Sequence, residues 1–315
     1  MKYVDQLNLS GKRVLVRADL NVPLDDQGKI ADDVRIRATI PTLKTIIQSG
    51  GRAIVCSHLG SPKGKQEPQL SLAPVAARLS ELLGRPVKLA PDCIGPETEA
   101  LAAALQNGEV LLLENLRFHA EEENNEGGFS QKLKRLADVY VNDAFGTAHR
   151  AHASTVGVVP LFEEKAGGLT MKSELEYFKQ AFNNPMRPLL AIFGGVKIST
   201  KMAALRNVGK QADVVLVGGA MANTLLAAKG CALGRSLVEA SEIENAKAAM
   251  QELSERGCRV VIPTDVVVAN ELKAGVTTKI KSVNELTAED MALDIGPQTL
   301  ELFRNEINKA GTIIW

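Results

Sequence analysis

Short apolar runs of strand length recur along the first half of the chain. A half-exposed antiparallel strand alternates apolar and polar residues, whereas a strand covered on both faces is apolar throughout. The runs here, such as "RVLVRA" and "VLLLEN", are continuous. The pattern therefore predicts four strands of a buried parallel sheet, at residues 13–18, 53–57, 110–115 and 139–143.

Helical patterns separate these runs, and the second half of the chain repeats the scheme. "SLAPVAARLSELLG" (71–84) carries one apolar stripe and ends on a glycine, and "PETEALAAAL" (96–105) is a second helix. Alternation of strands and helices in two blocks predicts an α/β fold with two doubly wound, parallel-sheet (Rossmann-like) domains. In the second block we expect strands at 188–195, 212–219, 259–265 and 311–315, and a long helix at 239–257.

The segment between the two blocks predicts a hinge. Residues 165–188 combine a Gly-Gly pair, a charged amphipathic helix and a proline-containing exit. A length of 315 residues suits about two domains. We therefore expect a first domain at 1–168, a connecting hinge helix at 169–186 and a second domain at 187–315.

Composition excludes several classes of protein. Lys plus Arg and Asp plus Glu both number 37, so bulk charge does not favour nucleic acid or a membrane surface as a partner. The four cysteines form no C-x-x-C pair and are expected to be buried thiols of a reducing compartment. The N-terminus lacks the apolar core of a secretory signal, and no run approaches the length of a membrane span. We expect a cytoplasmic protein.

Polar residues stand at the carboxyl ends of the first four predicted strands. Parallel strands bring these ends to one edge, where open α/β sheets bind ligands. Arginine pairs through two N–H groups with carboxylate or phosphate oxygens. Together these residues predict a basic cleft that binds a small, multiply charged anion. Its candidate residues are Arg17, Asp19, Asn21, Arg35, Arg37, His58, Gly60, Arg117, His149, Arg150 and His152.

The stretch "DAFGTAHRAHAST" (143–155) allows a metal site, a catalytic base, an anion-binding loop or a plain surface turn. His149 and His152 are three residues apart, but no cysteine is near and Asp143 lies back on the strand, so a bound metal is disfavoured. No nucleophile signature such as G-x-S-x-G occurs. We expect no protein-bound metal, and we favour Arg150 as an anion ligand.

The second block carries glycine pairs at two strand ends. Gly194 and Gly195 precede Lys197 and Lys201, and Gly218 with Gly219 follow the next strand. Glycines let a phosphate approach backbone N–H groups, and lysine adds a point charge. The pattern is neither a Walker A loop nor G-x-G-x-x-G. It favours a nucleotide or phosphate site, and two such domains around a hinge suit phosphoryl transfer with exclusion of water.

At these residues the chain closely resembles the phosphoglycerate kinase family, over essentially its whole length. The resemblance implies reversible phosphoryl transfer from 1,3-bisphosphoglycerate to Mg-ADP, giving 3-phosphoglycerate and Mg-ATP, by a monomer that closes about its hinge. The stretches that carry it are "VRADLNVP", "SHLG", "SLAPVA", "LLLENLRFH", "DVYVNDAFGTAHRAHAST", "RPLLAIFGGVKIST", "VVLVGGAMANT", "SVNELT" and "LDIGPQT".

The resemblance also implies roles for individual residues. The triose phosphate would be held by a set in the first domain, and Arg35 and Lys197 would act on the transferring phosphoryl group. The substrate set is Asp19, Asn21, Arg35, His58, Gly60, Arg117 and Arg150. The nucleotide set is Gly194, Gly195, Lys197, Lys201, Gly218 and Gly296.

Two departures from the family pattern carry expectations. Ser61 stands where the family usually has an arginine, which should weaken anion binding at the rim. The sequence ends at Trp315, before the family's Gly-Gly-Gly-Asp-Thr loop, whose Asp contacts Mg²⁺. We therefore expect an incomplete second domain and little activity from these residues alone. A non-catalytic anion-binding module stays an alternative, and a dehydrogenase is disfavoured by the lack of G-x-G-x-x-G.

Overall fold

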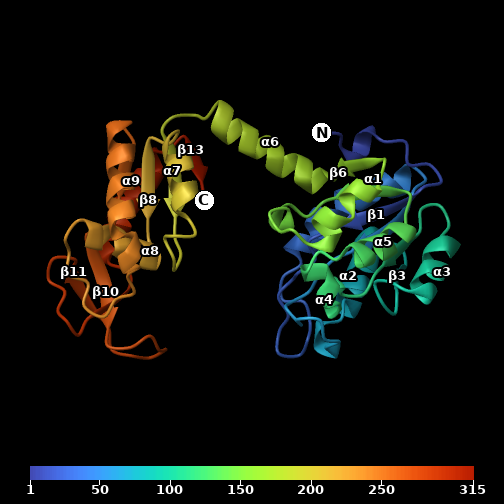
Figure 1. The fold of residues 1–315 in the computed structure, drawn as a ribbon, viewed down its shortest axis with the longest axis horizontal. Helices are drawn as coiled ribbons and strands as arrows, with labels where there is room; N and C mark the ends of the chain where they lie inside the picture. Colours follow the sequence, from blue (N-terminus) through green and yellow to red (C-terminus); the bar gives the residue numbers. More distant parts are fainter. The chain divides into compact units, whose positions relative to one another are not determined.

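A computed structural model describes residues 1–315. The chain forms two compact units, Met1–Glu176 and Tyr177–Trp315, hereafter unit 1 and unit 2 (Figure 1). The boundary falls inside helix α6 (Leu169–Asn183), in the segment for which sequence patterns indicate a connecting helix. None of the helices combines the length and the apolar character that a membrane crossing requires.

Unit 1 is built on a six-stranded parallel sheet, which contains the four strands predicted from the continuous apolar runs. Strand order is β3-β4-β2-β1-β5-β6, and every pair is parallel. β3 and β6 are short strands that the apolar pattern did not reveal. The bounds are β1 (Arg13–Arg17), β2 (Arg52–Cys56), β3 (Val87–Leu89), β4 (Val110–Leu112), β5 (Val139–Asn142) and β6 (Lys165–Gly167).

Helices cover both faces of this sheet (Figure 1). Along β1, Val14 and Val16 pack into one buried cluster with residues of α1 and α2, whereas Leu15 packs into another with residues of α3 and α5. Burial on both faces explains why the strand reads as apolar throughout. The helices are α1 (Val34–Gln48), α2 (Ala73–Leu83), α3 (Pro96–Ala104), α4 (Ala120–Glu123) and α5 (Gly127–Arg135).

Unit 2 contains a four-stranded parallel sheet of order β13-β7-β8-β9 and a separate antiparallel sheet of order β11-β10-β12. The antiparallel sheet was not predicted. The run 259–265, expected as one strand, is divided: β9 ends at Val261 and β10 begins at Asp265. The strands are β7 (Leu189–Phe193), β8 (Val214–Val217), β9 (Arg259–Val261), β10 (Asp265–Ala269), β11 (Lys279–Ser282), β12 (Met291–Ile295) and β13 (Thr312–Ile314).

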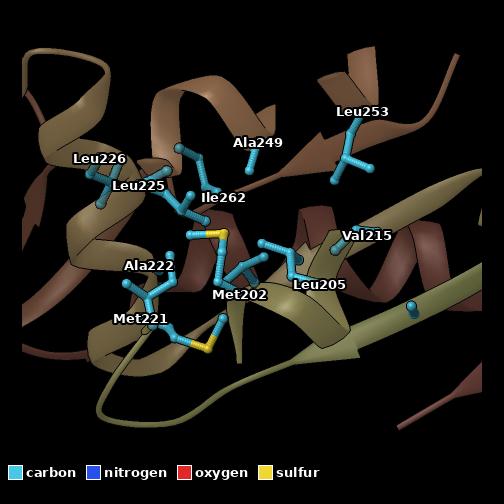
Figure 2. Packing of buried hydrophobic residues seen from close by; sticks show 14 of the residues in the cluster. Met202, Leu205, Val215, Met221, Ala222, Leu225, Leu226, Ala249, Leu253 and Ile262 are labelled. Carbon is cyan, nitrogen blue, oxygen red and sulfur yellow. The ribbon is translucent and has the colours of Figure 1, made fainter. Parts of the chain in front are cut away.

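The core of unit 2 lies where helices cover the parallel sheet. Figure 2 shows Met202 and Leu205 between Leu225, Ala249 and neighbouring apolar side chains. Its helices are α7 (Met202–Gly209), α8 (Gly219–Ala228), α9 (Ile243–Glu255) and α10 (Pro297–Lys309). Short 3-10 or π turns complete the chain: η1 (Val4–Gln6), η2 (Pro68–Leu70), η3 (Leu116–Phe118), η4 (Phe145–Thr147), η5 (Ala153–Gly157), η6 (Val159–Leu161) and η7 (Ala240–Glu242).

All four cysteines are free thiols. Cys56, Cys93 and Cys258 are buried, as expected, but Cys231 is only partly buried. Burial raises the pKa of the Cys56 thiol to about 12 and that of Cys258 to about 11. These two thiols therefore act as small apolar side chains at neutral pH.

Candidate functional site

The carboxyl ends of β1, β2, β4 and β5 lie side by side, because β4, β2, β1 and β5 are neighbours in the sheet. Four predicted clusters of polar residues are thereby gathered at one edge of unit 1. We call this set the basic edge: Asp19, Asn21, Arg35, His58, Gly60, Arg117 and Arg150.

Hydrogen bonds fix the loop that follows β2. The Asn21 side chain accepts a bond from the Gly60 N–H (2.8 Å), and Arg117 Nη1 donates to the Gly60 carbonyl (2.9 Å). Arg117 is only 6% exposed, and its Nε lies 3.2 Å from Glu123 Oε1. Burial lowers the pKa of this guanidinium below its usual value. One loop is thus held from two other strand ends.

Asn115 organises the same loop and has no role in the sequence-based set. It is fully buried, and its Nδ2 donates to the carbonyls of Leu59 (2.8 Å) and Leu70 (2.9 Å). Its Oδ1 accepts from the Arg117 N–H (3.1 Å). The polar pair Glu114 and Asn115 after an apolar run was the available signal, because a buried amide must find hydrogen-bond partners.

Arg35 is an exposed member of the basic edge. Its side chain is 50% exposed, and Nη1 donates to Asp19 Oδ2 at 2.6 Å. Gly146 passes so close to Asp19 that a Cβ there would come within 3.1 Å of the same oxygen. Asp19, Arg35 and Gly146 line a cavity of about 290 Å³. The ion pair holds Arg35 at this cavity.

The stretch 143–155 separates its three basic residues. Arg150 is exposed, and its positive charge lowers the pKa values of both His58 and Arg117, so it faces the same region. His149 is exposed, whereas His152 is partly buried. Burial lowers the pKa of His152. Arg150 is therefore the member of this stretch that adds charge to the basic edge.

His58 is buried among cations. Burial, and then the charges of Arg17, Arg117 and Arg150, lower its pKa to about 2. Arg17, which the sequence analysis left without a specific role, is 1% exposed and places Nη2 3.1 Å from His58 Nδ1. His58 is consequently a neutral imidazole at neutral pH, and it is unsuited to carry a positive charge to a ligand.

In unit 2, the glycine turns after β7 and β8 pack against each other. The Met221 N–H donates to the Gly195 carbonyl (3.0 Å), and the Gly218 N–H donates to the Phe193 carbonyl (2.9 Å). Gly219 has φ +66°, and a Cβ on it would lie 3.2 Å from the Gly195 oxygen. We call Gly194, Gly195, Lys197, Lys201, Gly218 and Gly219 the glycine edge.

The two lysines of the glycine edge are exposed and no ion pair holds them. Lys201 lies at the N-terminus of α7. Ser199, between them, is held by Glu239: its N–H and Oγ donate to the carboxylate at 3.0 and 2.7 Å. The loop backbone is thus anchored while its cationic side chains extend into solvent.

Gly296 has a packing reason to be glycine. It is the residue before α10, and a Cβ there would come within 2.3 Å of the Asp265 carboxylate. That carboxylate accepts from the N–H groups of Gln298 (3.0 Å) and Thr299 (2.7 Å) in the first turn of α10. Ile295, the residue before Gly296, lines a small cavity together with Gly219.

Asp92, Cys93 and His119 bring one metal-ligating atom each within 4.8 Å of one another. Hydrogen bonds account for this arrangement. Asp92 Oδ1 accepts from His119 Nε2 (2.7 Å) and from the Cys93 N–H (2.6 Å). The hydrogen bond to Asp92 raises the pKa of His119.

Comparison with known proteins identifies the family to which this chain belongs. Residues 4–315 match the phosphoglycerate kinase family. The chain belongs to the phosphoglycerate kinase family. The phosphoglycerate kinase of Desulfotalea psychrophila is 50% identical over 315 residues, which are 100% of this chain and 80% of that protein. That of Chloroherpeton thalassium is 49% identical over 314 residues, covering 100% and 79%.

Solved structures of phosphoglycerate kinases share the fold. The Coxiella burnetii enzyme superposes with a TM-score of 0.79 at 37% identity, over 99% of this chain and 79% of the other. The Pyrococcus horikoshii enzyme gives a TM-score of 0.82 at 31% identity, over 99% and 80%. The family resemblance and the prediction of two Rossmann-like α/β domains are therefore confirmed.

Proposed function

We propose that this protein carries out the reversible reaction of its family. The acyl phosphate of 1,3-bisphosphoglycerate passes to Mg-ADP, and 3-phosphoglycerate and Mg-ATP are formed. The observation that carries the proposal is the basic edge, where the parallel sheet brings the buried Arg117 and His58 and the exposed Arg35 and Arg150 to one side.

The basic edge suits the triose phosphate. Arg117 and Arg150 supply charge for the phosphate and carboxylate oxygens of 3-phosphoglycerate. Neutral His58 can donate one hydrogen bond, and Asn21 positions the Gly60 loop. Asp19 can accept a bond from the substrate hydroxyl when Arg35 leaves it for the phosphoryl group. Each group then has one chemical task.

The glycine edge suits the nucleotide. Backbone N–H groups beside Gly194, Gly195 and Gly218 can meet phosphate oxygens, since no Cβ blocks the approach. Lys197 and Lys201 are free to neutralise charge on the transferring group. The magnesium ion enters as part of the substrate, Mg-ADP.

The chemical step needs no protein nucleophile. A β-phosphate oxygen of ADP attacks the phosphorus of the acyl phosphate, the bond from phosphorus to the carboxyl oxygen breaks, and the carboxylate leaves with that electron pair. No proton changes hands at neutral pH. The protein contributes position and charge, with Arg35 and Lys197 stabilising the transferring phosphoryl oxygens.

We further infer that these 315 residues, taken alone as a polypeptide, bind 3-phosphoglycerate but turn over slowly. The relatives aligned above are about a quarter longer, consistent with coverage of 79–80%. Within these residues β13 is an edge strand of the parallel sheet. We propose a cytoplasmic monomer, in keeping with four unpaired thiols.

Titration calorimetry tests the proposal directly. We expect 3-phosphoglycerate to bind this chain with a stoichiometry of one, and sulfate to compete with it at high concentration. Mg-ADP is expected to bind weakly to the same polypeptide. A chain that is folded by circular dichroism but gives no heat with 3-phosphoglycerate, at low ionic strength, contradicts the assignment of the basic edge.

A further inference from the structure

One buried carboxylate beside the basic edge has no part in the function described so far. Glu122, in the short helix α4, is 0% exposed. Its Oε1 accepts a hydrogen bond from Ser154 Oγ at 2.5 Å, and its Oε2 accepts from the Ser154 N–H at 2.9 Å. An isolated buried carboxylate is costly, so it requires a compensating positive charge nearby.

That charge is Arg17, reached through the serine. Arg17 Nε donates to Ser154 Oγ at 2.9 Å, so the hydroxyl accepts from the guanidinium and donates to Glu122. Arg17 Nη1 donates to the Ala18 carbonyl. Both Arg17 and Ser154 are buried, and a hydroxyl has the donor and acceptor capacity for this bridge. The chain of bonds leaves the remaining nitrogen, Nη2, directed at His58.

Arg17 determines the protonation of the His58 ring. A guanidinium has only donors, so the contact between Arg17 Nη2 and His58 Nδ1 (3.1 Å) requires Nδ1 to accept. The imidazole must then be neutral and carry its proton on Nε2. The charges around it favour the same state, since Arg17, Arg117 and Arg150 all disfavour a cationic ring.

We propose that Glu122 is a positioning residue for the anion site: through Ser154 it holds Arg17, and Arg17 fixes His58 as the neutral tautomer with a proton on Nε2. His58 then presents one fixed hydrogen-bond donor to an anionic oxygen. The titratable groups that face this network are Arg117, Arg150, His152 and Glu123, together with the neutral side chains of Cys56, Cys93 and Tyr140. The inference rests on the proposed function only for the identity of that anion.

His152 supports a network built around Glu122. Its Nδ1 is buried without a hydrogen-bond partner and lies 4.0 Å from Glu122 Oε1. A small shift of the loop would bring this nitrogen into reach of the carboxylate. Glu122 therefore lies 4.0 Å from His152 and is connected to His58 through Ser154 and Arg17.

The test combines ring-nitrogen NMR of His58 with calorimetry of 3-phosphoglycerate, on the full 315-residue chain. Glu122→Gln keeps the shape and removes the charge, and Glu121→Gln makes the same change one residue earlier on the same helix. In the unmodified chain we expect one neutral tautomer, protonated on Nε2, between pH 5 and 8. For Glu122→Gln we expect a mixture of tautomers and an affinity about tenfold weaker, and for Glu121→Gln a change below about twofold.

Ser154→Ala keeps the experiment decisive if Glu122→Gln does not fold, because it removes only the bridging hydroxyl. It should give the same mixture of His58 tautomers. An unchanged single tautomer in both folded variants, or a proton on Nδ1 in the unmodified chain, overturns the proposal. If the unmodified chain does not bind 3-phosphoglycerate, the proposed function fails, and the His58 signal still decides the role of Glu122.

Discussion

The basic edge of unit 1 and the glycine edge of unit 2 occupy the same kind of position, beyond the carboxyl ends of parallel strands, but they are built differently. At the basic edge His58 and Arg117 are buried; His58 is hydrogen-bonded to the neighbouring buried Arg17, and Arg117 to the loop backbone. At the glycine edge the backbone turns are fixed, and the cationic side chains of Lys197 and Lys201 are exposed.

This difference separates two ways of preparing for an anion. A buried guanidinium with fixed partners loses little conformational freedom when a ligand arrives, whereas an exposed lysine must lose rotamer freedom on binding. The buried side chains of the basic edge therefore lose their conformational entropy during folding, before a ligand binds. At the glycine edge only the backbone is ordered in advance, and the ligand must order the side chains.

The largest test of this contrast is removal of a buried cation. Arg117→Ala deletes a group that bonds the Gly60 carbonyl and approaches Glu123, so the loop loses its support and Glu123 loses its partner. We expect 3-phosphoglycerate affinity to fall by about 100-fold, measured by calorimetry. Arg135→Ala, on an exposed face of unit 1, should change it by less than about twofold. A loss below threefold for Arg117→Ala contradicts a pre-ordered site.

The glycine edge should instead be sensitive to backbone substitution. Gly219→Ala forces an L-residue to φ +66° with its Cβ 3.2 Å from the Gly195 oxygen, and should destabilise unit 2 by about 1–3 kcal/mol. Gly218→Ala is the matched control, since nothing lies within 4 Å of a Cβ there. Urea denaturation measures both variants. Equal stability of the two would show that the turns do not depend on their close packing.

Lowering the pH should destabilise unit 1 because His58 takes up a proton in the unfolded state. Its folded pKa is about 2, below the value of about 6.5 in an unfolded chain, so the unfolded state binds the extra proton. This contribution to stability is complete above about pH 6.5 and is lost as the pH falls. It should cost unit 1 about 2 kcal/mol between pH 7 and pH 5. The loss should be absent in His58→Gln, as urea denaturation at the two pH values would reveal.

Asp143 acts in the opposite direction over part of the same range. Burial raises its pKa to about 6, so the folded state holds the extra proton between about pH 6 and pH 4 and gains stability as the pH falls. Asp143→Asn removes this gain and should lose about 1 kcal/mol more than the unmodified chain between pH 7 and pH 5. A shallower loss in Asp143→Asn contradicts the assignment.

The smallest effect is expected at the rim. Ser61 is exposed, and the arginine of the family pattern is absent there. Ser61→Arg should tighten 3-phosphoglycerate binding about two- to fivefold at low ionic strength, because an exposed charge contributes little and is screened. The gain should disappear in about 0.5 M salt. A gain that survives salt would place Ser61 inside the pre-ordered part of the site.

The four central strands of unit 1 could be predicted because burial on both faces requires a continuous apolar run, whereas the short edge strands β3 and β6 gave no such pattern. The antiparallel sheet of unit 2 could not: in β11 (Lys279–Ser282) two lysines flank Ile280, which is itself 61% exposed. Most residues of the basic edge could be predicted because they follow strands in the sequence. The parallel sheet then brings the ends of those strands to one edge. Glu122 was not, because an acidic residue within "AEEE" is typical of a solvated helix, and only tertiary packing buries it.

Helix α6 is anchored at its start, and most of its side chains between residues 173 and 180 are exposed. Asp143 accepts from the N–H groups of Thr170 (2.8 Å) and Met171 (3.3 Å), and Met171 is the helix's one buried residue. Tyr177 is 70% exposed. A helical segment that buries few side chains is only marginally stable. Its middle should therefore exchange amide protons early, and brief chymotrypsin digestion there offers a route to each unit as a separate polypeptide.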